Sequence, residues 1–361
     1  MSPTATALSQ QSTHPARART MRAAILVRQQ APLEVAELTI PALDVGQVLV
    51  KLAFSGICGK QLDEISGVRG ADAFLPHLLG HEGSGIVQEV GPGVRKVKPG
   101  DHVILHWVKS SGIDSSPPRF TWNGAQVSAG WVTTFSDYTI ASENRLTPIA
   151  QDVPLDIACL LGCAVTTGLG IVFNNADLKP GQSIAVFGVG GVGLNVLQGA
   201  ALVNAHPIIA VDIHDRKLAQ AKTFGATHTI NATGTDVKRA LRDLSGGRGI
   251  DVTVDLTGQG TVRETAYDST SATGRTIFGG VPPHDSQLRI DSFPIHFGRR
   301  LIGVHGGDTR PEVDIPRYLQ LHRLGKLKLE EQITHRMPLA KVNEAIAVVQ
   351  QGGAGRCVLV L

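Results

Sequence analysis

A glycine-rich turn between an apolar run and a helical run constrains the fold of this chain more than any other feature. Ser183–Phe187 is an apolar run typical of a buried strand, and Gly188-Val189-Gly190-Gly191-Val192-Gly193 follows it directly, leading into the helical run Val192–Val203. In such a turn the first glycine permits the bend, the second lets a pyrophosphate approach the backbone, and the third lets helix pack on strand. The helix N-terminus offers free N–H groups to the phosphates. The pattern therefore predicts a dinucleotide site rather than an empty turn.

A carboxylate at the end of the next apolar run distinguishes between the two nicotinamide cofactors. Asp212 follows the run Pro207–Val211. At this point a carboxylate accepts hydrogen bonds from the ribose hydroxyls and repels a 2′-phosphate, so it favours NAD over NADP. Arg216 and Lys217 lie just beyond it and could attract a phosphate, and Lys217 is itself a candidate cofactor contact. We predict NAD.

The order of strand-like and helical runs divides the chain into two kinds of structure. From Met21 to Leu161, short strand-like runs alternate with glycine and proline turns, which predicts a barrel-like domain. From residue 164 to 305, strands alternate with helices, as in a parallel sheet covered on both faces. The fold class is therefore α/β, with residues 21–163 and 306–361 in a β-barrel domain and residues 164–305 in a doubly wound nucleotide-binding domain. The predicted strands are Ala23–Val27, Gln47–Phe54, Gly85–Glu89, Asp101–His106, Ser183–Phe187, Pro207–Val211, Gly249–Leu256 and Arg275–Phe278, and the predicted helices are Val192–Val203, Asp215–Thr223 and Leu339–Gln350.

Two cysteines and one histidine at three distant points form a candidate metal site. They are Cys58 in Gly-Ile-Cys-Gly, His81 in Leu-Gly-His-Glu-Gly, and Cys163 in Leu-Gly-Cys-Ala-Val-Thr-Thr-Gly. Two thiolates and one imidazole are a ligand set for zinc with one position left open for water or substrate. The remaining cysteines, Cys159 and Cys357, are interpreted as small buried hydrophobic residues.

The composition argues against several other classes of protein. The 361 residues carry a formal net charge of only +3 and no long basic run, so we expect no nucleic-acid partner. No apolar stretch is long enough to span a bilayer, so we expect no membrane partner. Four widely spaced cysteines suit a reducing compartment, and we expect a cytoplasmic protein. Residues 1–20 lack acidic residues and an apolar segment, which predicts a disordered extension, with a transit peptide as the alternative.

Together these motifs resemble those of the zinc-containing medium-chain alcohol dehydrogenases over nearly all of Met21–Leu361. The segments that carry the resemblance are Ser-Gly-Ile-Cys58-Gly, Gly80-His81-Glu82-Gly83, Gly162-Cys163-Ala-Val-Thr-Thr167-Gly168, the glycine turn, Gly279-Gly280-Val281-Pro282-Pro283 and Ile333-Thr334-His335. The resemblance implies a GroES-like barrel domain, a Rossmann domain, NAD and one catalytic Zn²⁺ per chain. It implies hydride transfer between an alcohol and NAD.

The resemblance also implies roles for individual residues. Cys58, His81 and Cys163 would hold the zinc, with Glu82 behind them; Thr167 and Val281 would flank the nicotinamide, Thr257 is a further candidate cofactor contact, and Arg356 would approach the pyrophosphate. Dimers or tetramers joined at the sheet edge around Leu301–Val304 are implied as well.

One departure from the family pattern concerns a second metal. Many relatives carry a structural zinc in a lobe with four closely spaced cysteines, which should fall between His106 and Phe135. This chain has no cysteine there. We predict a single zinc ion per chain, with the lobe replaced by a polar loop.

A second departure concerns the substrate proton. Where the family pattern places Ser or Thr after Cys58-Gly59, and a His further along, this chain has Lys60 and Asp63. A lysine close to a divalent cation and partly shielded from water gives up its proton more readily. Lys60 is therefore a candidate general base, with Asp63 as its partner or outlet. The alternative is that Lys60 points to solvent and that water carries the proton.

The substrate is the least constrained part of the prediction. The stretch that replaces the lobe is expected to border the cleft and contains Trp107, Lys109, Arg119, Trp122 and Asn123. Its polarity favours a polyol, sugar derivative or cyclitol, with a simple primary or secondary alcohol as the alternative. A zinc-independent quinone or enone reductase, or an inactive nucleotide-binding relative, is the competing class, although neither needs the three metal ligands.

Overall fold

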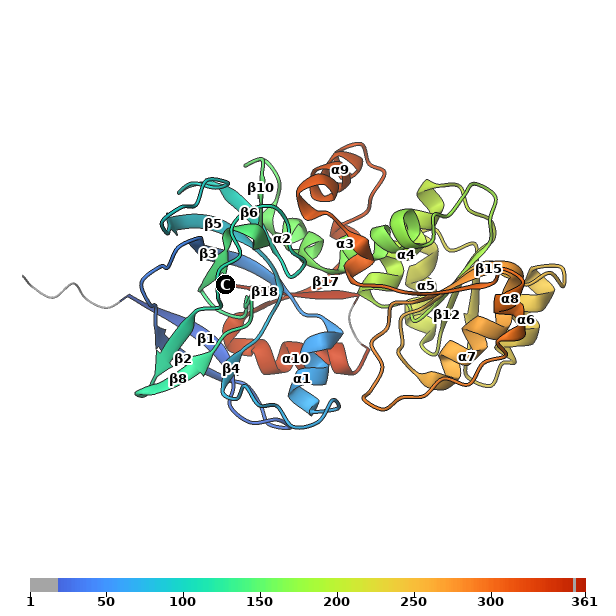
Figure 1. The fold of residues 1–361 in the computed structure, drawn as a ribbon, viewed down its shortest axis with the longest axis horizontal. Coiled ribbons are helices and arrows are strands. Elements are labelled where there is room, and N and C mark those ends of the chain that lie inside the picture. Colours follow the sequence, from blue (N-terminus) through green and yellow to red (C-terminus); the bar gives the residue numbers. More distant parts are fainter. Residues whose placement is uncertain (1–18, 353–354) are drawn as a thin grey trace, which may run out of the picture.

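The computed structural model describes residues 19–352 and 355–361 of the chain. The molecule is elongated, with most of the β-structure of the first half in one lobe and a second sheet in the other (Figure 1). The extension predicted for residues 1–20 lies outside the described residues, apart from its last two. Thr20 is already the first residue of strand β1, and Arg19 pairs with Glu89 at 2.6 Å.

A closed barrel forms one part of the first lobe. Its strands follow the order β1-β2-β7-β8-β4, with β4 pairing back to β1. Its core is a cluster of buried apolar side chains that includes Met21, Leu38, Phe120 and Val127. The strands are β1 (Thr20–Leu26), β2 (Glu34–Thr39), β4 (His77–Leu78), β7 (Arg119–Trp122) and β8 (Ala125–Ser128).

A second sheet, of seven strands, combines five strands from the first half of the chain with two from its C-terminal end. Its order is β10-β6-β5-β3-β18-β17, and β9 also pairs with β3. The C-terminal strand β18 lies antiparallel beside β3, so that Val358 is opposite Gly56. The strands are β3 (Gln47–Gly56), β5 (Glu82–Val90), β6 (His102–His106), β9 (Tyr138–Ser142), β10 (Leu146–Ile149), β17 (Ile333–Pro338) and β18 (Arg356–Val360).

The third sheet is the parallel sheet predicted around the glycine turn. Its order is β13-β12-β11-β14-β15-β16, the strand order 3-2-1-4-5-6 of a doubly wound nucleotide-binding domain. All five strand pairs are parallel. The strands are β11 (Ile184–Phe187), β12 (Ile208–Asp212), β13 (His228–Asn231), β14 (Ile250–Asp255), β15 (Thr270–Phe278) and β16 (Arg300–Gly303).

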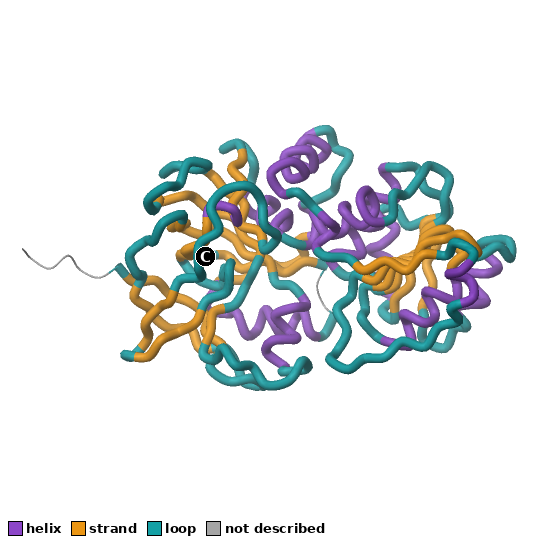
Figure 2. Tube along the Cα trace, viewed as in Figure 1, coloured by secondary structure: helices purple, strands orange, loops and turns teal. Residues whose placement is uncertain are grey.

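Helices cover both faces of this parallel sheet (Figure 2). Alternate residues of β11 point to opposite faces, as the period of a strand requires. Ile184 and Val186 pack with α4, whereas Ala185 and Phe187 pack with α6 and α7. The helices are α1 (Gly59–Ser66), α2 (Leu155–Ala158), α3 (Ala164–Gly170), α4 (Gly191–Leu202), α5 (Asp215–Thr223), α6 (Val237–Leu244), α7 (Gly260–Ser269), α8 (Phe293–His296), α9 (Pro311–Arg323) and α10 (Val342–Gln350).

The predicted fold class is confirmed, and each predicted strand and helix overlaps an observed element of the same type. The parallel sheet draws all its strands from residues 184–303, and the other two sheets draw theirs from residues 20–149 and 333–360. The domain limits at residues 164 and 305 remain our proposed division. Among the described residues, no single helix is both long and apolar enough to cross a membrane; the helical pair Leu155–Gly162 and Ala164–Asn175, bent by 53°, meets those criteria only when its members are taken together.

Candidate metal centre and nucleotide cleft

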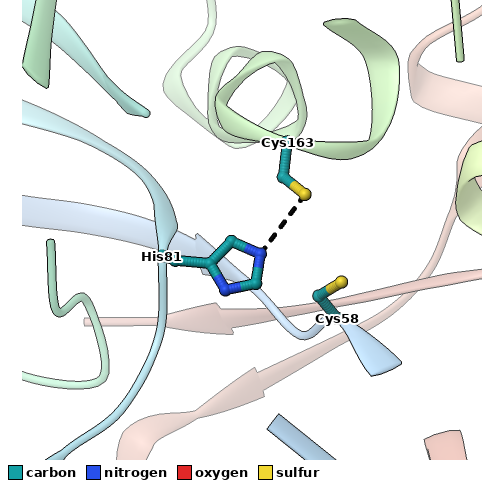
Figure 3. Close-up of side chains that lie close together, drawn as sticks. All are labelled: Cys58, His81 and Cys163. Carbon is teal, nitrogen blue, oxygen red and sulfur yellow. Dashed lines mark hydrogen bonds between the residues drawn. The ribbon is translucent and has the colours of Figure 1, made fainter. Parts of the chain in front are cut away.

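The fold brings the three predicted metal ligands together. The ligand atoms of Cys58, His81 and Cys163 all lie within 4.8 Å of one another, and His81 Nε2 is 3.2 Å from Cys163 Sγ (Figure 3). Zinc–donor bonds of about 2.0 to 2.3 Å separate tetrahedral donors by roughly 3.5 Å. The three side chains therefore fit a zinc ion with small adjustments.

Secondary structure positions each ligand. Cys58 immediately precedes helix α1, and Cys163 immediately precedes helix α3. Both thiols are thus at the positive end of a helix, which favours the thiolate form that binds metals. His81 comes directly before β5, a strand that also pairs with β3 shortly before Cys58.

The two sulfurs share one site, and their protonation is linked. The interaction with the neighbouring Cys163 side chain, against the opposing effect of burial, holds the pKa of Cys58 well below its usual range. The same contact, together with burial, raises the pKa of Cys163. A divalent cation between the sulfurs would stabilise both as thiolates.

Gln61 supports two of the ligands at once, and the sequence did not lead us to predict it. Its side chain is buried, with 1% of the residue exposed. Its Oε1 accepts a hydrogen bond from Cys58 N at 3.0 Å, and its Nε2 lies 2.7 Å from Nδ1 of His81. The second ring nitrogen of a metal-binding histidine commonly has such a partner, which fixes the orientation of the ring.

A buried ion pair lies behind the metal ligands. Glu82, with no exposed side-chain surface, pairs through Oε1 with Nη2 of Arg356, and its Oε2 accepts from Ala164 N at 3.3 Å. Glu82 therefore connects the strand that follows His81 to the helix that follows Cys163. On its other side Arg356 lies against the glycine turn, because a Cβ at Gly191 would be 2.7 Å from its Cδ.

A cleft of about 870 Å³ runs from the metal site along the glycine turn. The metal ligand Cys58 lines it, as do Lys60 and Asp63. Every residue predicted to contact the cofactor lines it except Thr167, which lies instead beside Cys163, where its side chain opposes, in small part, the rise in the pKa of that thiol caused by Cys58 and by burial. The lining cofactor candidates are Gly188, Gly190, Gly191, Val192, Gly193, Asp212, Lys217, Thr257, Val281 and Arg356.

The glycines of the turn have the geometry expected of a dinucleotide loop. Gly188 has a left-handed backbone conformation with φ +90°, which glycine adopts most readily. A Cβ at Gly190 would meet no neighbour within 4 Å, so a ligand can approach its backbone. At Gly193 a Cβ would overlap the carbonyl oxygen of Gly188, so only glycine lets helix α4 come this close.

Asp212 holds the same turn from the next strand. Its Oδ2 accepts a hydrogen bond from Val189 N at 2.8 Å, and its Oδ1 accepts from His214 N at 3.0 Å. Arg216 donates to the carbonyl of Gly352 at 2.7 Å. Of Arg216 and Lys217, it is Lys217 that lines the cleft.

Comparison with known proteins agrees with this geometry. Residues 44–151 match the alcohol dehydrogenase GroES-like domain, and residues 191–322 match the zinc-binding dehydrogenase domain. The chain is 34% identical to the S-(hydroxymethyl)glutathione dehydrogenase of Escherichia coli O6:H1, over 94% of this chain and 99% of that protein. It is 32% identical to the class-3 alcohol dehydrogenase of Cereibacter sphaeroides, with the same coverage. The chain belongs to the zinc-containing medium-chain alcohol dehydrogenase family.

Solved structures of family members have the same fold. The zinc-binding alcohol dehydrogenase domain protein of Burkholderia ambifaria superposes with a TM-score of 0.89 at 29% identity, covering 95% of this chain and 99% of that one. The benzyl alcohol dehydrogenase of Acinetobacter calcoaceticus gives 0.87 at 27% identity, with the same coverage. This dehydrogenase is thus a zinc- and NAD-dependent oxidoreductase that acts on small alcohol or carbonyl substrates.

Lys60 and Asp63 of the dehydrogenase line the cleft but do not pair with each other. Lys60 Nζ is 2.9 Å from Oε1 of Glu64, one helical turn along α1. Asp63 Oδ2 is 2.8 Å from Nη2 of Arg69. The carboxylate beside Lys60 is therefore Glu64 and not Asp63. The other role expected of Asp63, as the outlet for the proton, stays a prediction.

The segment that replaces the structural-zinc lobe is more ordered than the predicted polar loop. Part of it forms β7 and β8, a hairpin of the barrel that turns at Asn123-Gly124. Trp107 lies beside Cys163, where its side chain partly opposes the rise in the pKa of that thiol caused by Cys58 and by burial, and its ring meets that of His305 edge-on, with the ring centroids 4.8 Å apart. Lys109 lies over the ring of Trp131 and pairs with Asp114. Trp107 is thus the residue of this segment that the structure places beside the metal site.

Proposed function

We propose that the dehydrogenase oxidises a small primary or secondary alcohol, polyols and cyclitols included, with NAD as the hydride acceptor, and that it catalyses the reverse reduction. The observation that supports this most directly is the convergence of Cys58, His81 and Cys163 beside a cleft lined by the glycine turn. A quinone or enone reductase, or an inactive nucleotide-binding relative, would need no such donor set. When bound, zinc polarises the substrate oxygen and makes an alcohol more acidic.

The residues of the chain would then act as follows. The glycine turn and Arg356 bind the pyrophosphate, and Asp212 binds the adenosine ribose. Val281, with the Thr257 loop packed against it, and Thr167, from its place beside Cys163, flank the nicotinamide. Lys60 accepts the substrate proton at Nζ, and Glu64 holds the resulting ammonium. The alternative is that water alone carries the substrate proton and that Lys60 stays paired with Glu64 throughout. Replacing Lys60 with Met and recording the pH–rate profile separates the two, since an unchanged profile removes the lysine from proton transfer.

The substrate is best identified by testing a panel of candidate substrates with the zinc-loaded protein. NAD reduction is measured with simple alcohols, benzyl alcohol, polyols, cyclitols, sugar derivatives and S-(hydroxymethyl)glutathione, and bound metal is determined on the same sample. Activity that depends on NAD and disappears on chelation supports the proposal. Activity that survives complete removal of the metal would contradict it.

We also propose that two copies of the chain associate through strand β16. This strand is the last of the parallel sheet, and an unpaired edge readily accepts a strand from a second copy. Large apolar side chains are exposed on and beside it: Phe293 (68%), Phe297 (61%) and Leu301 (38%). Light scattering should show a dimer or tetramer, and Leu301→Lys should shift the population toward monomer; a monomeric unaltered protein would contradict the proposal.

A further inference from the structure

Two loops meet at the end of the cleft where the nicotinamide is proposed to bind. One follows β14 and carries Thr257, and the other follows β15 and carries Val281; both residues line the cleft. The backbones of the two loops are in direct contact, because a Cβ at Gly280 would overlap the Gly258 nitrogen, and a Cβ at Gly258 would overlap the Val281 carbonyl. The position of one loop therefore sets the position of the other.

Asp255, at the end of β14, is bonded to both loops. Its side chain is fully buried. The carboxylate accepts hydrogen bonds from Thr257 N at 3.0 Å, from Thr257 Oγ1 at 2.6 Å and from Gly258 N at 3.1 Å. Its main-chain carbonyl accepts from Gly279 N at 2.8 Å and from Gly280 N at 2.9 Å. One residue thus ties together the two loops that shape this end of the cleft.

Arg263, on helix α7, completes the connection from the other side. Its Nε lies 3.2 Å from Oδ2 of Asp255, and its Nη2 donates to the Gly280 carbonyl. The guanidinium also lies over the ring of Phe278, 4.8 Å from its centroid. The planar fork of an arginine can make these contacts simultaneously, which a lysine cannot.

We propose that Asp255 and Arg263 act as a positioning pair that holds Thr257 and Val281 in the arrangement that receives the nicotinamide ring. This inference rests on the nicotinamide placement in the proposed function. No hydrogen bond or ion pair joins Asp255 or Arg263 to Asp212 or to the N-terminus of α4, where the rest of the cofactor is proposed to bind. The pair therefore acts on the nicotinamide end of the cofactor and not on its ADP-ribose part.

A comparison of two ligands distinguishes effects on these two parts of the cofactor. NADH carries the nicotinamide, and ADP-ribose lacks it. Affinities for both are measured by calorimetry on the full chain loaded with zinc. Arg263→Lys keeps a cation beside Asp255 but loses the fork, and it should weaken NADH binding about tenfold, the effect of one lost hydrogen bond to a charged group. ADP-ribose binding should stay within about twofold.

Arg299→Lys provides a matched control. Arg299 also stacks on an aromatic ring, 4.9 Å from the centroid of Tyr267, and donates to the carbonyls of Ser271 and Tyr267 at 3.2 Å. It lines a separate cavity of about 460 Å³. Its replacement should leave the affinities for both ligands unchanged.

The outcomes distinguish a positioning role from a general structural one. Equal weakening of NADH and ADP-ribose in Arg263→Lys, or no weakening of either, overturns the proposal. If that variant does not fold, Asp255→Asn is measured in the same way, because its amide oxygen can still accept from Thr257 while the charge is lost. An unaltered protein that binds NADH no more tightly than ADP-ribose contradicts the nicotinamide placement itself, whereas equal weakening in the variant contradicts only the positioning pair.

Discussion

Replacing Gln61 should change the affinity for zinc in opposite directions, depending on the replacement. An imidazole that binds metal through Nε2 carries its proton on Nδ1, so the side chain at position 61 faces two donors, the Cys58 N–H and the His81 Nδ1–H. Gln61 has a single acceptor oxygen, so it can satisfy only one of these two donors. The oxygen is bonded to Cys58 N at 3.0 Å, while the amide nitrogen lies 2.7 Å from His81 Nδ1; when zinc binds, the amide can turn so that its oxygen accepts from His81 instead, which leaves the Cys58 N–H unsatisfied. A glutamate at this position would offer an acceptor to each donor.

The magnitudes follow from these two contacts. Gln61→Glu gains one hydrogen bond to a charged group, about 1.5 to 3 kcal/mol, so zinc should bind about ten- to a hundredfold more tightly. Gln61→Met leaves the histidine ring without a partner, and loss of such a partner typically weakens metal binding about ten- to a hundredfold. The same change leaves the Cys58 N–H unsatisfied, which should lower the free energy of unfolding by about 1 to 3 kcal/mol.

Zinc affinity is measured by competition with a chromophoric chelator after the metal has been removed, and stability by urea unfolding of the metal-free protein. Gln47→Met is a suitable control. Gln47 is equally buried, accepts from Asp44 N at 2.9 Å and donates to the Ser116 carbonyl at 3.1 Å, but contacts no metal ligand. It should lose stability without losing zinc affinity. A Gln61→Glu variant that binds zinc more weakly than the unaltered protein would refute the reasoning.

Three further predictions follow from other parts of the structure. Asp212→Ala should raise the KM for NAD and reduce the preference for NAD over NADP, because it removes both the ribose acceptor and the bond to Val189 N; steady-state kinetics with the two cofactors would check this, and unchanged preference would contradict it. Burial lowers the pKa of His106 to about 3, from an ordinary value of 6.5. As pH falls, this histidine is therefore protonated in the unfolded chain at a higher pH than in the folded protein. Its contribution to the free energy of unfolding is complete above pH 6.5 and should decrease by about 2 kcal/mol between pH 7 and pH 5. Urea unfolding of metal-free His106→Gln should show a pH dependence of the unfolding free energy that is smaller by that amount. Metal analysis should find one zinc ion per chain, since no cysteine lies between His106 and Phe135, and two ions would contradict this.

The metal ligands and the glycine turn were predictable because their chemistry depends on residue type and local spacing. The strand before the turn is buried on both faces and therefore appears as a continuous apolar run, which is why the predicted Ser183–Phe187 differs from β11 by one residue. Helix α5 has the predicted ends, Asp215 and Thr223, since its polar and apolar positions alternate with helical period.

The β7–β8 hairpin was missed although its turn signal is present in the sequence. Asn123 and Gly124 both have positive φ, +50° and +77°, as a two-residue hairpin turn requires, and Asn-Gly is the pair that adopts it most readily. Each strand has only four residues, with one fully buried apolar side chain, Phe120 in β7 and Val127 in β8. So short an alternation does not stand out from a polar loop without the rest of the barrel beside it.

Of the residues that support the metal site, Glu82 was expected from the resemblance, but Gln61 and the pairing of Arg356 with Glu82 were not predictable by the same reasoning. Gln61 and Arg356 act through hydrogen bonds to a backbone N–H, a ring nitrogen and a carboxylate, and several other side chains could make such bonds. No residue type or spacing therefore marks these positions. Glu82 and Arg356 are 274 residues apart and meet because β18 pairs with β3, beside β5. The metal ligands can be recognised from local motifs, whereas the groups that orient them are brought together by the strand order. A sequence therefore predicts the ligands of a metal site of this kind more readily than the residues that hold those ligands in place.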